Sequence, residues 1–126
     1  MLNYEWDARA LLSLVLVGLP ELADRMELRR NRSLLSRVHH RIAIGPLTHG
    51  DTAEYVRMRL TRVGCDREIF GSDATAMIHE ATHGAMRDID RIATAALKDA
   101  GRKKARLVER DVVARILDAE STREAA

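Results

Sequence analysis

The spacing of hydrophobic positions changes near residue 48 and divides the chain into two regions. Before residue 48, apolar residues form short continuous runs. After it, they recur every three or four residues, as on one face of a helix. The first run, Leu11–Val17, is followed by Gly18 and Pro20. This pattern predicts a short strand buried on both faces, with a sharp exit into a helix.

A second apolar run, Arg41–Leu47, predicts another strand, which ends at Pro46 because proline cannot continue a hydrogen-bonded ladder. Between the runs, helices are expected from Pro20 to about Arg30 and from Ser33 to Val38. Two strands are too few for an independent parallel sheet, which needs further strands and helices on both faces. Residues 1–47 are therefore expected to be the truncated back part of a larger α/β domain.

The region from residue 48 has the pattern of four amphipathic helices. Capping residues and glycines mark their expected ends. The expected helices run from a cap at Thr48 or Asp51 to Gly64, from Ser72 to Gly84, from Met86 to Gly101, and from Glu109 to Glu120. Residues 48–120 are thus predicted to form an all-helical domain, and residues 121–126 a disordered tail.

Charge adds a first candidate function. Lys and Arg number 21 against 19 Asp and Glu, so the total charge indicates no partner. Basic residues nevertheless cluster in two segments, which are either solvated surface or contacts for an anion or nucleic acid. A helical DNA-binding module is therefore one alternative, although aromatics at 3% argue against a surface that stacks bases. The clusters are Arg25, Arg29, Arg30, Arg32, Arg37 and Arg41, and Arg102, Lys103, Lys104 and Arg106.

The N-terminus shows no secretory signal, because Glu5 and Asp7 interrupt it and no cleavage site follows. The apolar run Ala10–Leu19 is too short to span a bilayer. A single cysteine, Cys65, cannot form an internal disulfide, which fits a reducing compartment. A cytoplasmic protein without membrane insertion is expected.

Four motifs follow one another along the chain. They are Leu14-Val15-Leu16-Val17-Gly18-x-Pro20-Glu21-Leu22, Ser36-Arg37-x-x-x-x-Ile42-x-Ile44-x-Pro46-Leu47, Thr52-Ala53-x-Tyr55-Val56-x-x-Arg59-Leu60 and Gly84-x-x-Arg87-x-Ile89-x-Arg91. Their order and spacing resemble the C-terminal half of AAA+ ATPases. The match is best to the ExeA-like group, which contains general secretion pathway protein A and the transposition helper ATPases.

The resemblance implies a fold and roles for four residues. Residues 1–47 would supply the last strands of the parallel sheet of a P-loop nucleotide-binding domain, and 48–120 a four-helix lid. Gly18 and Leu19 would occupy the sensor-1 position beside the nucleotide, although Leu19 has no polar group to orient water. Arg37 would be the arginine finger, with Arg41 as the second choice.

Arg87 would be the sensor-2 arginine, with Met86 before it where the family usually has proline. A guanidinium suits the finger and sensor roles because its rigid fork of donors matches phosphate oxygens. The alternative for Arg37 and Arg87 is surface ion pairing.

The chain contains no Gly-x-x-x-x-Gly-Lys-[Ser/Thr] and no apolar strand that ends in Asp-Glu. ATP and Mg²⁺ are therefore expected to bind only the full-length protein, and this piece alone is expected to be non-catalytic and to bind no cofactor or metal. Because a finger acts on a neighbouring subunit, the resemblance implies a homo-oligomer. It also implies partners among DNA and the proteins of secretion or transposition. The abrupt start of the chain favours a fragment over a degenerate relative.

His79-Glu80-Ala81-Thr82-His83 spells a competing H-E-x-x-H motif on an expected helix. In zinc hydrolases two such histidines bind the metal and the glutamate is a general base. Here Gly84 is expected to stop the helix at once, and Ile89 stands where the longer signature has a third histidine. Structural roles for His79 and His83 are the preferred interpretation, and a zinc hydrolase is kept as a third alternative.

Overall fold

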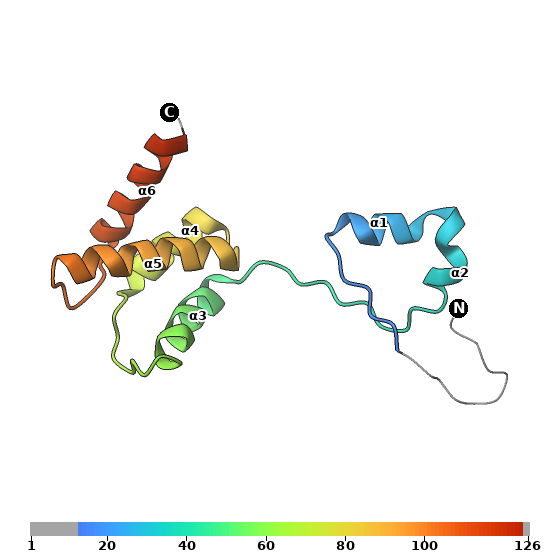
Figure 1. Cartoon of the computed structure of the whole chain (residues 1–126), viewed down its shortest axis with the longest axis horizontal. Helices are drawn as coiled ribbons and strands as arrows, with labels where there is room; N and C mark the ends of the chain where they lie inside the picture. The colour runs from blue at the N-terminus through green and yellow to red at the C-terminus, as the bar shows by residue number, and fades with distance from the viewer. Residues whose placement is uncertain (1–12, 125–126) are drawn as a thin grey trace. The chain divides into compact units, whose positions relative to one another are not determined.

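The structure is a computed structural model that describes residues 13–124, and the chain divides into two compact units, Met1–Ala43 and Ile44–Ala126 (Figure 1). We call them the N-terminal and the C-terminal unit. Residues 1–12, which include the start of the first predicted strand, lie outside the described part, as do the last two residues of the predicted tail.

The N-terminal unit contains three short helical segments: α1 (Glu21–Glu27), the 3-10 helix η1 (Arg29–Asn31) and α2 (Arg32–Leu35). Pro20 precedes α1 with a helical backbone conformation, as the prediction of a helix after the first run requires. The Asn31 side chain donates a 2.6 Å hydrogen bond to the carbonyl oxygen of Arg25. None of the described residues 13–43 is buried, so these helices form no core of their own.

The two segments predicted as strands are irregular where the structure describes them. Residues 14–17 and 41–44 have no strand assignment. Their apolar side chains face water, with Val17 88%, Ile42 87% and Ile44 94% exposed. The physical reason is that a strand forms only when a neighbouring strand pairs with its backbone groups, and runs apolar on both faces need cover on both sides. The parallel sheet stays a prediction about a longer protein.

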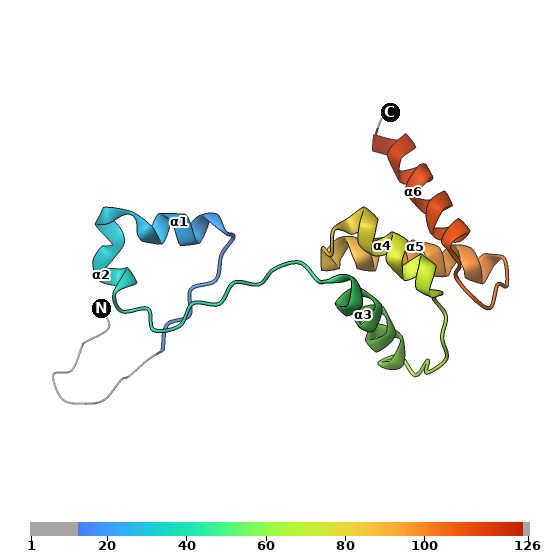
Figure 2. The ribbon, with the colours of Figure 1, turned by 180° about the vertical axis from the view of Figure 1, so that it is seen from behind.

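The C-terminal unit contains four helices: α3 (His49–Thr61), α4 (Ser72–Thr82), α5 (Met86–Arg102) and α6 (Arg110–Glu124). Figures 1 and 2 show α4 packed against both α5 and α6, with α3 beside α4. The helix pattern agrees with the predicted lid. The observed helix ends differ from the predicted ones by a few residues. Helix α5 continues one residue past Gly101, and α6 continues four residues past Glu120. No helix within residues 13–124 is both long and apolar enough to cross a bilayer.

The core of this unit is aliphatic and lies between the four helices. In α5 the buried residues recur at helical spacing, which creates one apolar face along the helix. The buried hydrophobic residues are Val56, Phe70, Ala74, Ile78, Ile89, Ile92, Ala93, Ala96, Ala100, Val108, Val112 and Val113. All of them lie after residue 48, so the part of the chain with helical periodicity is also the part that packs.

Two loops are joined by a short parallel bridge between Phe70 and Val108. The backbone N–H of Val108 donates to the carbonyl of Ile69 at 2.6 Å, and the N–H of Gly71 donates to the carbonyl of Val108 at 3.0 Å. These bonds fix the starts of α4 and α6 relative to each other, because each helix begins within two residues of the bridge.

Thr48 caps α3, which confirms one of the two predicted caps. Its hydroxyl accepts from the Asp51 N–H at 3.2 Å, and the Asp51 carboxylate accepts from the Thr48 N–H at 3.2 Å. The Thr48 hydroxyl also donates to that carboxylate at 2.6 Å, and these bonds from Thr48 lower the pKa of Asp51. This reciprocal arrangement satisfies N–H groups that a helix start otherwise leaves open.

Candidate functional site

Three of the predicted site residues lie in the N-terminal unit. Gly18 and Leu19 precede α1, and Leu19 is 76% exposed. A Cβ atom on Gly18 would lie 2.7 Å from Cδ2 of Leu22, so the chain turns closely over that side chain. Arg37 follows α2, is exposed, and makes no ion pair to any residue in 13–124.

Arg87 lies in the C-terminal unit, at the second residue of α5, which agrees with the expected position near a helix start. It is exposed, and no carboxylate of the described residues pairs with it. The acidic neighbours on its own helix are engaged elsewhere. Asp88 accepts a 3.3 Å hydrogen bond from Arg91, which also pairs with Glu120 of α6. The Arg87 guanidinium is thus presented to solvent at the start of α5.

The second acidic neighbour, Asp90, is held by α3. The Tyr55 hydroxyl donates to Oδ2 of Asp90 at 3.1 Å, and Nε of Arg59 lies 3.7 Å from Oδ1. The guanidinium carbon of Arg59 lies 6.0 Å from the centre of the Tyr55 ring, within cation–π range. Partial burial and, next, the bond to Asp90 raise the pKa of Tyr55, so this hydroxyl keeps its proton for Asp90. Both Asp90 oxygens therefore face α3 residues.

The turn before α5 is fixed by the chain segment that enters the C-terminal unit. The backbone N–H of Leu47 donates to the carbonyl of Gly84 at 2.9 Å. Gly84 is buried and has φ +80°, and His83 before it has φ +49°. A Cβ atom at Gly84 would lie 2.8 Å from the Leu47 nitrogen and closer still to the Leu47 oxygen. Only glycine fits at this position. The contact with Leu47 fixes where α5 begins and therefore where Arg87 lies.

The H-E-x-x-H segment has a structural role. The helix α4 ends at Thr82, and His83 has a left-handed backbone. His79 and His83 therefore do not lie on consecutive turns of one helix. Nδ1 of His79 lies 2.9 Å from the buried Thr52 hydroxyl. Since that hydroxyl donates to the Thr48 carbonyl at 2.9 Å, it accepts from His79. The described residues contain no group of three or more potential ligands that could hold a metal ion.

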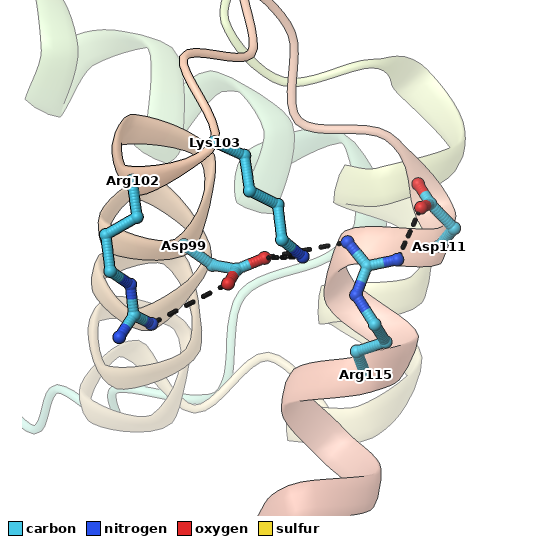
Figure 3. Close-up of polar contacts among 5 residues, drawn as sticks. All are labelled: Asp99, Arg102, Lys103, Asp111 and Arg115. Atoms are coloured by element: carbon cyan, nitrogen blue, oxygen red, sulfur yellow. Dashed lines mark hydrogen bonds and ion pairs between the residues drawn. The ribbon is translucent and has the colours of Figure 1, made fainter.

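The basic segment 102–106 is partly neutralised from within the fold (Figure 3). Asp99 of α5 accepts from the Lys103 amine at 2.8 Å and lies 3.6 Å from the Arg102 guanidinium. Arg115 of α6 lies 3.5 Å from the same carboxylate and 2.6 Å from Asp111. The Lys103 amine, followed by Arg115, lowers the pKa of Asp99. Asp99 thus engages two cations of the segment, Arg102 and Lys103, and its pair with Arg115 joins α5 to α6.

This cluster predicts an acid-dependent loss of stability. Asp99 has a lowered pKa in the folded chain, so its contribution is complete above the unfolded-state pKa of about 4 and disappears as pH falls through the lower folded-state value. Asp99→Asn is expected to have a lower free energy of unfolding than the parent chain at pH 7. This difference should disappear below about pH 4. Urea unfolding of both chains at pH 7 and pH 3 measures it. Asp118→Asn, on exposed α6 surface, is the control.

Several residues that shape the site escape a pattern-based search. Asp90 and Asp99 are acidic positions on an amphipathic helix, and only the structure shows that they meet Arg59 of α3 and Arg115 of α6. One local signal was available, because Asp99 stands three and four residues before Arg102 and Lys103, a spacing typical of helical ion pairs. The Leu47–Gly84 contact joins residues far apart in sequence and has no such signal.

Comparison with known proteins gives one strong similarity. The chain is 38% identical over 95 residues to general secretion pathway protein A of Aeromonas hydrophila. The chain is related to this secretion protein. The matched stretch is 75% of this chain and 17% of the Aeromonas protein, so the chain spans a small part of its relative's length. No protein-family model and no solved structure matches the chain.

Proposed function

We propose that this chain acts as the C-terminal part of an ATPase of the AAA+ type that serves secretion. The observation that carries the proposal is the 38% identity to general secretion pathway protein A over three quarters of the chain. In this proposal the C-terminal unit is the lid, and the apolar runs at 11–17 and 41–47 are strands of a parallel sheet. The exposed side chains of Leu14–Val17, Ile42 and Ile44 support this, since neighbouring strands and helices would cover them.

Two arginines would act on the nucleotide. Arg87, exposed at the start of α5 and without an ion pair to any residue of 13–124, would contact phosphate from the same subunit as the lid. Arg37, equally exposed, would contact the γ-phosphate held by a neighbouring subunit, which requires a homo-oligomer. A guanidinium placed on the transferred phosphate stabilises the charge of the transition state. Gly18 and Leu19 would end the strand beside the nucleotide, with Leu19 supplying only apolar contact.

ATP hydrolysis in this proposal needs a phosphate-binding loop and Mg²⁺-binding carboxylates that residues 1–126 do not supply. The reading frame upstream of Met1 is the first test, and it is expected to encode a Gly-x-x-x-x-Gly-Lys-[Ser/Thr] loop. The joined protein is expected to hydrolyse ATP, whereas the 126-residue chain is not. An upstream frame without such a loop, or a joined protein that does not bind ATP, would contradict the proposal.

A DNA-binding module receives less support from the described residues. Of the basic segment 102–106, Arg102 and Lys103 pair with Asp99, which leaves less positive charge for a phosphate backbone. The zinc alternative is opposed by the end of α4 before His83 and by the bond between His79 and Thr52.

A further inference from the structure

The acidic residue best placed to neutralise Arg87 is Asp90. On a helix, side chains three and four residues apart are neighbours, whereas adjacent residues point in different directions. The positions three and four residues after Arg87 are Asp90 and Arg91. Arg91 repels Arg87, so Asp90 is the only carboxylate on α5 at the spacing that would pair with it. An Arg87–Asp90 pair would compete with any phosphate that approaches the guanidinium.

The structure shows why that pair does not form. Oδ2 of Asp90 accepts from the Tyr55 hydroxyl at 3.1 Å, and Oδ1 lies 3.7 Å from Nε of Arg59. Both groups come from α3, so each oxygen of the carboxylate already faces a donor on the neighbouring helix. Asp88 is similarly engaged by Arg91. No ion pair joins Arg87 to any residue in the described range 13–124.

We propose that Tyr55 and Arg59 are positioning residues for Arg87, because they hold the Asp90 carboxylate on α3 and keep the Arg87 guanidinium available to a phosphate. This inference rests on the proposed phosphate contact of Arg87. Tyr55 and Arg59, which pack α3 against α5, thereby also determine whether the positive charge of Arg87 at the start of α5 is neutralised. When either α3 donor is removed, Asp90 turns towards Arg87 and becomes an internal competitor for the ligand.

The first test observes the pair itself and needs no ligand. The ¹³C shift of the Asp90 carboxylate is measured in the 126-residue chain with and without Arg87→Gln. In the parent chain the carboxylate ¹³C shift should not respond to Arg87→Gln, since Tyr55 and Arg59 hold Asp90. In Tyr55→Phe/Arg59→Gln the Asp90 carboxylate ¹³C shift should change when Arg87→Gln is added, because Arg87 and Asp90 form a pair in that background. A response of the same size in both backgrounds would overturn the inference.

The second test uses inorganic tripolyphosphate as the probe and follows the Arg87 Nε–H signal by NMR at low salt. Tyr55→Phe/Arg59→Gln is expected to weaken binding at Arg87 about two- to fivefold, the range of an exposed ion pair. Adding Asp90→Asn should restore the parent affinity, because the competitor is then neutral. Failure of Asp90→Asn to restore binding would show that Tyr55 and Arg59 act only by packing α3, and would overturn the inference.

The two tests separate this inference from the proposed function. If tripolyphosphate does not bind at Arg87 in the parent chain, the proposed phosphate contact fails, while the carboxylate measurement still decides whether Tyr55 and Arg59 keep Asp90 from Arg87. Helix content by circular dichroism accompanies every variant. Tyr55→Phe and Arg59→Gln are also examined singly, so that one unfolded double variant does not prevent the measurement.

Discussion

Arg37→Ala in the longer protein is expected to reduce ATP turnover by about a thousandfold or more while ATP binding stays close to the parent value. The reason is that a finger arginine acts mainly on the transition state, where charge spreads over the transferred phosphoryl group, and it reaches that group from a neighbouring subunit. Steady-state ATP hydrolysis and equilibrium binding of a fluorescent ATP analogue measure the two effects.

Arg30→Ala is the matched control, since Arg30 is another exposed arginine of the N-terminal unit and is expected to leave turnover unchanged. Mixing provides a sharper test. Arg37→Ala subunits combined with subunits inactivated in the phosphate-binding loop should regain part of the activity, because each variant supplies what the other lacks. Absence of any recovery in mixed oligomers that do assemble would argue against a finger that acts between subunits.

Gly84→Ala is expected to destabilise the C-terminal unit by about 4 kcal/mol, through backbone strain and overlap with Leu47 together. Gly84 has φ +80°, and an added Cβ would lie 2.8 Å from the Leu47 nitrogen. For a unit of this size that is a large part of a total stability of roughly 4–12 kcal/mol. Urea unfolding followed by circular dichroism measures the loss.

Gly64→Ala is the matched control for this change. Gly64 has nearly the same backbone, φ +81°, but an added Cβ meets nothing within 4 Å. The Gly64→Ala variant therefore measures only the strain of the left-handed conformation, which costs about 1–2 kcal/mol. The difference between the two variants therefore reports the contact with Leu47 alone. Equal losses for Gly84→Ala and Gly64→Ala would show that the segment entering the C-terminal unit does not hold the turn before Arg87.

Local sequence signals predict the helical half of the fold well. The spacing of Ile89, Ile92 and Ala96 gives the buried face of α5 directly, because a helix repeats about every 3.6 residues. Thr48 is predictable as a cap from its position before an apolar pattern, and its bonds to Asp51 bear this out. Such features depend on residues within a few positions of one another, and a sequence displays those neighbours.

Features that depend on distant partners are not predictable in the same way. The run at 14–17 has strand-forming residues, but no partner strand lies within the described residues, and the segment stays irregular. The predicted site residues Arg37 and Arg87 fall in different units, so no local pattern in the sequence relates one to the other. Asp90 gives no local sign that Tyr55 and Arg59 will hold it, because that choice is made by the packing of α3 on α5.

The uncovered apolar runs have a consequence for handling this protein at the bench. Leu11–Val17 is a seven-residue stretch without charge or proline, which is the composition of segments that stack into fibrils when left in water. Within residues 13–124, the buried hydrophobic residues all lie between Val56 and Val113. A recombinant piece that begins at Ile44 would therefore keep the whole core and omit this run, which makes it the better sample for NMR at high concentration.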